Sequence, residues 1–316
     1  MSIIDTVSKQ YLRSKRVFAD IFNYVLYDGK QVIKAEQLLP VSEGLTMLDD
    51  RFKEAKEIKR DRDIRMNLTA MEDPKTVYLL LGIESQANVD YTMPVRSALY
   101  DMLEYVRQIQ EIKREHAKKQ EKGRRGGEFL QGFYREDRIT PIVTVVVFFG
   151  SEEWDGPTSL HEMFDTEEEE ILSHTVYYKM NLISPSQMTD EEIDKFESSM
   201  QEVSRYIKCS KDKEALAKLV REDERYRELE VEAAMLLNVV TNSNLKIKEG
   251  EEKIDMCKAI EDMRAESLEE GLEKGREKTL RQMAHKLLDL GMSISDIAKL
   301  VEEDEIKVEN WVASYN

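Results

Sequence analysis

The sequence predicts an α/β core followed by an all-helical C-terminal region. All six prolines lie at or before Pro185, and no glycine occurs between Gly156 and Gly250. Proline and glycine mark turns and strand ends, so their loss indicates a change from mixed to helical structure. The apolar run IVTVVVFF at residues 142–149 is the strongest strand signal in the chain, and its continuity predicts burial on both faces of a sheet.

The first half alternates helical and strand patterns. Residues 14–27 are predicted to form a helix, because apolar residues recur there at helical spacing, and Asp28-Gly29 ends it. Two strands are predicted at residues 64–69 and 77–84, joined by a hairpin loop at 71–74. An amphipathic helix at 94–109 starts at Pro94. This order of a helix, paired strands, a helix and a strand is typical of an α/β core.

The second half reads as helical from a capping box at Thr189 and Glu192 onward. Helical spacing of apolar residues continues through 193–207, 216–220 and 229–240. A long helix from about 254 to 290 is ended by Gly291, and one or two short helices follow. We therefore divide the chain into a core at 1–185, a helical extension at 186–250, and a long helix with a small helical tail at 251–316.

Composition restricts the setting in which the protein works. With 41% hydrophobic and 35% charged residues and no long apolar run, the chain predicts a globular protein without a membrane span. The N-terminus lacks the order of a signal peptide, and Cys209 and Cys257 suit a reducing compartment, so we expect a cytoplasmic protein. The net charge of −17 means that any contact with nucleic acid must rely on a locally basic surface.

Asp63 and the tripeptide Glu84-Ser85-Gln86 form the candidate catalytic constellation. Residues i and i+2 of a strand share a face, so Glu84 and Gln86 project together. If the two strands pair as a hairpin, Asp63 lies opposite the end of the second strand. Carboxylates are ligands for Mg²⁺, with Mn²⁺ as an alternative, and Gln86 would orient the attacking water. The competing interpretation is that these are surface charges of ordinary strands.

Five segments resemble one family of nucleases. They are LGIESQANVDYTMPVRSALYDMLEY at 81–105, FADIFNYVLYDGKQVI at 18–33, RDI at 62–64, VVFFGSEEWDGPTSLHEMFD at 146–165 and MCKAIEDMRAESLEEGLEKG at 256–275. Together they resemble the Rpn / PD-(D/E)XK nuclease-family transposases. The resemblance implies a restriction-endonuclease-like core, in which helices flank a central mixed sheet. It also implies metal-dependent DNA cleavage linked to recombination or mobile elements. Gln86 stands where the superfamily has lysine, which lowers the expected rate of cleavage but leaves the metal site intact.

The superfamily resemblance also implies an acidic residue on the first helix. Asp20 is the candidate metal ligand there, with Glu36 as the reserve. The alternative for Asp20 is an ordinary solvated charge on a helix.

Candidate DNA contacts cluster between the helix at 94–109 and the strand at 142–149. The segment 113–125 is rich in lysine and arginine and is predicted to form a loop that grips phosphate, or else a solvated linker. Arg96 could clamp a phosphate or could pair with Glu84 or Asp90. The predicted contacts are Arg96, Lys113, Arg114, Lys118, Lys119, Lys122, Arg124 and Arg125.

The sequence of the C-terminal helices favours helix–helix association over the recognition of DNA in a groove. The tail resembles a helix-turn-helix, but its second helix is too acidic to approach phosphate in a groove. Gly271 and Gly275 instead favour close packing of two soluble helices, so we expect a homo-oligomer through the C-terminal helices. The sequence thus predicts a Mg²⁺-dependent DNA endonuclease. The alternative is a catalytically weak nuclease-fold protein that binds DNA or a partner through helical self-association.

Overall fold

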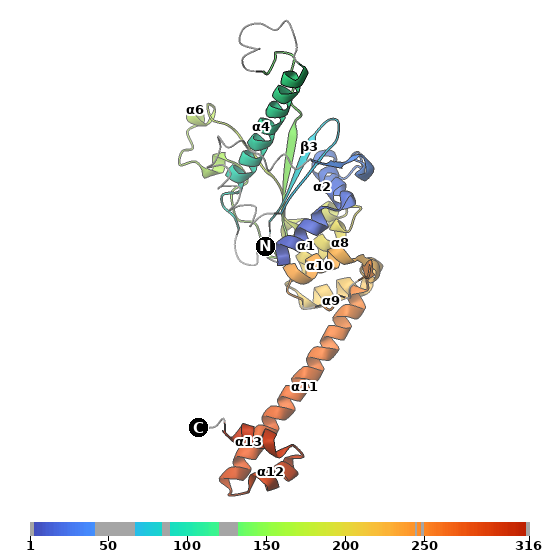
Figure 1. Cartoon of the computed structure of the whole chain (residues 1–316), viewed down its shortest axis with the longest axis vertical. Helices are drawn as coiled ribbons and strands as arrows, with labels where there is room; N and C mark the ends of the chain where they lie inside the picture. Colours follow the sequence, from blue (N-terminus) through green and yellow to red (C-terminus); the bar gives the residue numbers. More distant parts are fainter. Residues whose placement is uncertain are drawn as a thin grey trace. The chain divides into compact units, whose positions relative to one another are not determined.

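The computed structural model describes residues 3–41, 67–83, 89–119, 132–243, 245–247 and 250–313. The chain divides into two compact units, Met1–Met256 and Cys257–Asn316 (Figure 1). Within the described ranges, every helix is too short or too polar to cross a membrane.

The larger unit is built on a mixed sheet with the strand order β1-β2-β3-β4-β5. Strands β1, β2 and β3 pair antiparallel, whereas β4 runs parallel to both β3 and β5. The strands are β1 (Leu39–Pro40), β2 (Asn67–Glu72), β3 (Val77–Ile83), β4 (Ile142–Phe148) and β5 (Asn181–Ile183). The predicted mixed sheet flanked by helices is therefore confirmed, and β4 is a mostly buried interior strand.

Helix α4 (Met93–Lys119) covers one face of the sheet (Figure 1). Its Met93 and Tyr100 share a buried core with Val77 and Leu79 of β3 and with Phe148 of β4. The T-shaped contact between Phe148 and Trp154, with ring centroids 5.3 Å apart, extends this core toward the loop that follows β4. The start of α4 therefore lies at the carboxyl ends of the parallel strands β3 and β4.

Two N-terminal helices cover the opposite face. Helix α2 (Lys15–Tyr27) places Phe22 against Tyr78 of β3, with ring centroids 4.9 Å apart. Helix α1 (Ile3–Leu12) places Tyr11 edge-on to Phe149 at 6.4 Å. Helix α1 also packs on α10, so the helical second half adjoins this face of the sheet.

The helical part of the larger unit contains a two-stranded ladder. In it, β6 (Leu229–Glu230) pairs antiparallel with β7 (Lys253–Ile254). The remaining elements of the unit are η1 (Ala35–Gln37), η4 (His161–Met163), α6 (Glu169–Leu172), η5 (Pro185–Gln187), α7 (Asp190–Ile193), α8 (Met200–Cys209), α9 (Lys213–Glu222), η6 (Glu224–Glu228) and α10 (Val231–Val240).

The smaller unit has its own core. It consists of α11 (Met256–Asp289), α12 (Ile294–Val301) and α13 (Glu305–Ala313). Ala284 of α11 packs with Ile297 of α12 and with Trp311 of α13. Gly291, with φ of +84°, makes the left-handed turn that ends the long helix, as the sequence predicts.

Three predicted boundaries were wrong for local reasons. The β2–β3 turn begins at Asp73, whose Oδ1 accepts the backbone N–H groups of Lys75 and Thr76, so residues 71 and 72 belong to the strand. Helix α4 continues to Lys119, ten residues beyond the predicted end, because its last turns contain good helix formers and no glycine.

The third boundary concerns the helix predicted through 193–207, which is broken. The capping box at Thr189 and Glu192 is present in both directions, but α7 ends at Ile193 and α8 begins only at Met200. The backbone N–H groups of Glu197 and Ser198 are bound by Asp20 and so are not available to a helix.

Candidate functional site

The predicted catalytic residues Asp63, Glu84 and Gln86 lie outside the described residues, as do Lys122, Arg124 and Arg125. Their roles stay predictions. In the described part of the chain, no three His, Cys, Asp or Glu side chains gather into a metal-binding group. The structure does describe the elements next to these residues along the chain, and these define the surroundings of the candidate site.

The β2–β3 hairpin adjoins both halves of the candidate site along the chain. Asn67, the first residue of β2, is paired with Gly82 near the end of β3. Asp63 comes four residues before Asn67, and Glu84 and Gln86 come two and four residues after Gly82. Because the strands are antiparallel, both segments leave the hairpin at the same end.

The start of α4 is fixed by Asp90. Its Oδ1 accepts hydrogen bonds from the backbone N–H of Thr92 at 2.9 Å and from the Thr92 hydroxyl at 2.6 Å. Its Oδ2 pairs with Nη1 of Arg96. Burial raises the pKa of Asp90, but the Thr92 hydrogen bonds and the Arg96 charge outweigh it, so this pKa lies below its usual value. The carboxylate therefore stays ionised and holds the first turn of the helix.

The loop after β4 holds the same segment from the other side. The Tyr91 hydroxyl donates to both oxygens of Asp155, at 3.0 and 3.1 Å. The indole N–H of Trp154 donates to the carbonyl of Gly156 at 2.9 Å. A Cβ at Gly156 would lie 2.7 Å from Cγ1 of Val89, so glycine permits this close approach. Residues 89–91 are thus held between α4 and this loop.

Arg96 combines a structural contact with unused donors. Its side chain is 12% exposed and binds Asp90 through Nη1. Its Nε and Nη2 atoms are buried and have no hydrogen-bond partner among the described residues. The structure therefore shows the predicted pairing with Asp90, and it leaves two donors of a planar guanidinium for another acceptor.

The basic surface is a helix end rather than a loop. Lys113, Arg114, Lys118 and Lys119 lie exposed on the last turns of α4. The same end of the helix is braced by His116, whose Nε2 lies 3.0 Å from Oδ1 of Asp137. The prediction of a loop was wrong for these residues, and a rigid helix fixes the positions from which their side chains extend.

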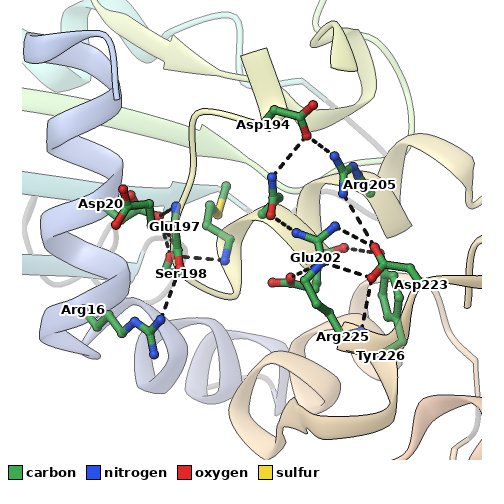
Figure 2. A network of polar contacts seen from close by, with 12 residues as sticks. Arg16, Asp20, Asp194, Glu197, Ser198, Glu202, Arg205, Asp223, Arg225 and Tyr226 are labelled. Atoms are coloured by element: carbon green, nitrogen blue, oxygen red, sulfur yellow. Dashed lines mark hydrogen bonds and ion pairs between the residues drawn. The ribbon is translucent and has the colours of Figure 1, made fainter. Parts of the chain in front are cut away.

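Asp20 binds a turn that is remote in sequence (Figure 2). Its Oδ2 accepts hydrogen bonds from the backbone N–H of Glu197 at 2.9 Å, and from the backbone N–H and hydroxyl of Ser198 at 2.8 and 2.7 Å. Its Oδ1 accepts a bond from Nε2 of Gln31 at 2.9 Å. Arg16, on the same helix, donates to the Glu197 carbonyl at 3.2 Å.

This set of bonds gives Asp20 a structural role in the described chain. The side chain is 2% exposed, and both of its oxygens are engaged by protein donors. The alternative interpretation, an ordinary solvated charge on a helix, is therefore wrong. A role for Asp20 as a metal ligand stays a prediction and would require the carboxylate to share these bonds with the ion.

A surface pocket of about 570 Å³ opens beside the same turn. Its charged side chains are largely matched with one another. Arg225 binds Asp223 at 2.6 Å and Glu202 at 3.3 Å, while Lys253 binds Glu228 at 2.7 Å (Figure 2 shows the Arg225 group). Because these ion pairs satisfy each other, we assign no ligand to the pocket.

The polar residues on the buried side of α4 were not singled out from the sequence. Asp101 accepts hydrogen bonds from the hydroxyls of Thr144 and Tyr178, the latter at 2.9 Å. Burial raises the pKa of Asp101, and these two hydrogen bonds only partly oppose the effect. Glu104, fully buried, forms a two-point contact with Arg107 at 2.5 and 2.7 Å. Only the three-dimensional placement of the helix reveals these partners.

Comparison with known proteins identifies the family. A family model described as "Putative transposase, YhgA-like" matches residues 5–232, from α1 into the start of α10. The chain therefore belongs to the YhgA-like transposase family, and the predicted resemblance is confirmed. No curated protein and no solved structure matched the chain significantly.

Replacing Asp20 with alanine should destabilise the larger unit. Asp20→Ala leaves several buried donors without an acceptor, so we expect the free energy of unfolding to fall by about 3 kcal/mol or more. The measurement is urea unfolding in EDTA, so that no metal contributes. Glu228→Ala is the matched control, because its bond to Lys253 is exposed and should contribute little. Equal effects of the two substitutions, or an Asp20 effect seen only with added Mn²⁺, would contradict the anchoring role.

Proposed function

We propose that the protein is a metal-dependent DNA endonuclease that hydrolyses phosphodiesters in recombination or mobile-element biology. Membership of the YhgA-like transposase family supports an action on DNA. The observation that carries the proposal is the pairing of Asn67 with Gly82. It sends the segments that contain Asp63 and Glu84 away from the same end of one hairpin.

Each candidate residue has a distinct role in this proposal. Asp63 and Glu84 hold Mg²⁺, with Mn²⁺ as a substitute, and Gln86 orients the attacking water through its amide. The bound cation would polarise the phosphodiester and lower the pKa of a coordinated water. Arg96 lies in the first turns of α4, near the carboxyl ends of β3 and β4. Its Nε and Nη2 are buried, so two-point contact with a phosphate would require the side chain to leave Asp90 and turn outward.

A locally basic surface would let an acidic protein hold DNA. The net charge of the chain is −17, yet the end of α4 presents Lys113, Arg114, Lys118 and Lys119 together. Contacts with phosphate depend on the charge at the interface and not on the total. We propose that this helix end, together with residues 122–125, binds the DNA backbone.

The second candidate function is binding without turnover. In this reading, the nuclease fold is catalytically weak and acts on DNA or a partner by self-association through α11–α13. Leu268 and Leu272 lie one turn apart on α11 and are 65% and 67% exposed, which favours a helical contact there. Glutamine at position 86 also favours this reading, because the superfamily's lysine is absent.

Plasmid nicking separates the two functions. We expect the purified wild-type protein to nick supercoiled DNA with Mg²⁺ or Mn²⁺, and Asp63→Ala to lose at least about 100-fold in rate, because a metal ligand is removed. Asp61→Ala, two residues away, is the matched control and should keep its activity. Equal nicking by wild type and Asp63→Ala would exclude the proposed site. Activity in neither protein would favour the binding function.

The salt dependence of DNA binding tests the basic helix end. Combining Lys118→Ala with Lys119→Ala should lower the slope of log K against log salt by about 2, because two phosphate contacts are lost. The matched control combines Lys213→Ala with Lys218→Ala on the exposed side of α9. Fluorescence anisotropy with a labelled duplex gives both slopes. A flat salt response of the wild type, or the same slope in both variants, would contradict the proposal.

A further inference from the structure

Helix α4 buries its charged side and exposes an apolar side. Seven of its residues are buried, and they include Ser97, Asp101, Glu104 and Gln108. Val95 and Met102, by contrast, are 45% and 53% exposed. This is the reverse of the usual surface helix, whose apolar stripe faces the core.

The exposed side has the spacing of a helix-pairing seam. Val95, Leu99, Met102, Val106 and Ile109 follow one another at intervals of four and three residues. With 3.6 residues per turn, they fall within about 80° of the helix circumference. A narrow stripe of this spacing is typical of a seam between two helices. We call these five residues the α4 stripe.

Between positions 95 and 112, the half of the helix around the α4 stripe carries no charge, and Lys113 is the next residue in line with the stripe. All charged residues between positions 95 and 112 lie on the opposite half: Arg96, Asp101, Glu104, Arg107 and Glu111. The residues that flank the stripe are Ala98, Leu103, Tyr105, Gln110 and Ile112. A partner that covers the stripe must therefore present an uncharged helical face of similar length.

The polar bonds on the sheet side fix this orientation. The amide Nε2 of Gln108 donates to the backbone carbonyl of Thr140 at 3.2 Å, and its Oε1 accepts from the backbone N–H of Thr140 at 2.7 Å. The side chain thus satisfies both backbone groups of Thr140. Asp101 is bound by Thr144 and Tyr178. Turning the helix to bury the stripe would break these bonds. Among the described elements, α4 makes most of its contacts with β4. Along the stripe, Val95 and Met102 are exposed, whereas Leu99, Val106 and Ile109 are half-buried.

The two ends of α4 carry opposite charge. Asp155 lies at its N-terminal end, where Tyr91 links the Asp155 carboxylate to the helix start, and the neighbouring Asp90 is paired with Arg96. Lys113 and Arg114 lie exposed near its C-terminal end. Two antiparallel copies would bring each acidic end to a basic end, whereas two parallel copies would oppose like charges. The helix dipoles also favour the antiparallel arrangement.

We propose that two copies of this chain associate through their α4 stripes, antiparallel, about a two-fold axis at Met102. Val95 of one copy then lies opposite Ile109 of the other, and Leu99 opposite Val106. The same surface serves both copies, as a two-fold interface requires. The exposed Leu268 and Leu272 of α11 are a less suitable partner surface for the stripe. The charged residues Glu269, Glu273 and Lys274 adjoin them, whereas the stripe requires an uncharged face. The proposal does not depend on nuclease activity.

Cysteine cross-linking of the full chain tests this arrangement. In a Cys209→Ser, Cys257→Ser background, Met102→Cys should form a disulfide-linked dimer on mild oxidation. Val95→Cys and Ile109→Cys should each remain uncross-linked alone and should cross-link when mixed. Cross-linking of Val95→Cys with itself would overturn the antiparallel arrangement. Absence of all cross-links would overturn the proposal, and it is the result expected if another segment of the same chain covers the stripe.

Solution mass gives an independent readout. Met102→Glu places a charge in the seam on both sides, so it should raise the dissociation constant by at least about tenfold and halve the mass seen by light scattering. Val32→Glu is the matched control, because Val32 is 51% exposed and lies next to α2 on the other face of the sheet. Circular dichroism confirms that both variants are folded. An unchanged mass for Met102→Glu, or an equal loss in the control, would contradict the proposal.

Discussion

The larger unit depends on one buried carboxylate. Asp20 lies in the middle of α2, the helix that packs Phe22 on the sheet, and it binds the turn at residues 197–198 that precedes α8. A buried charge is costly unless several donors satisfy it, and here four hydrogen bonds do so. Removing either partner would leave the other unsatisfied, so the sheet and the helical half are joined as one unit.

The same bonds explain why the helical half has its shape. A continuous helix through residues 193–207 would use the N–H groups of Glu197 and Ser198 within the helix. Asp20 takes them instead, and α8 starts afresh at Met200. Around this junction, Gly29 with φ of +85° lets the end of α2 approach Lys195, where a Cβ would lie only 2.8 Å from that residue's Cβ. The joint is thus specified by contacts from the middle of α2 and from the turn that follows it.

The sequence predicted the helices and strands better than it predicted the long-range contacts between them. Periodicity located α2, α4, β4 and the long α11, and local chemistry located the capping box at Thr189 and the stop at Gly291. These signals arise within a few residues of where they act. The hydrogen bond between Asp20 and Ser198 joins positions 178 residues apart, so no local sequence pattern predicts it. Likewise, the apolar spacing on α4 predicted a helix but not which side faces the sheet, because buried polar residues with matched partners reversed the usual rule.

The candidate site was predicted from a family resemblance more than from local physics. Glu84-Ser85-Gln86 alone carries no signal, and its importance comes from the motif that surrounds it. The structure adds the surroundings: a hairpin whose ends meet at Asn67 and Gly82, a helix start held by Asp90, and Arg96 with two buried donor atoms that have no partner among the described residues. These features explain how two carboxylates from distant parts of the chain could be presented at one end of the sheet.

Calorimetry of Mn²⁺ binding tests the central claim most directly, because it needs no assumption about the DNA substrate. The account predicts saturable binding to the wild-type protein and a loss of at least about tenfold in affinity for Glu84→Ala, since one of the carboxylate ligands is removed. Glu214→Ala, on the exposed side of α9, serves as the comparison and should bind like the wild type. Equal Mn²⁺ affinity in the wild type and Glu84→Ala would contradict the account.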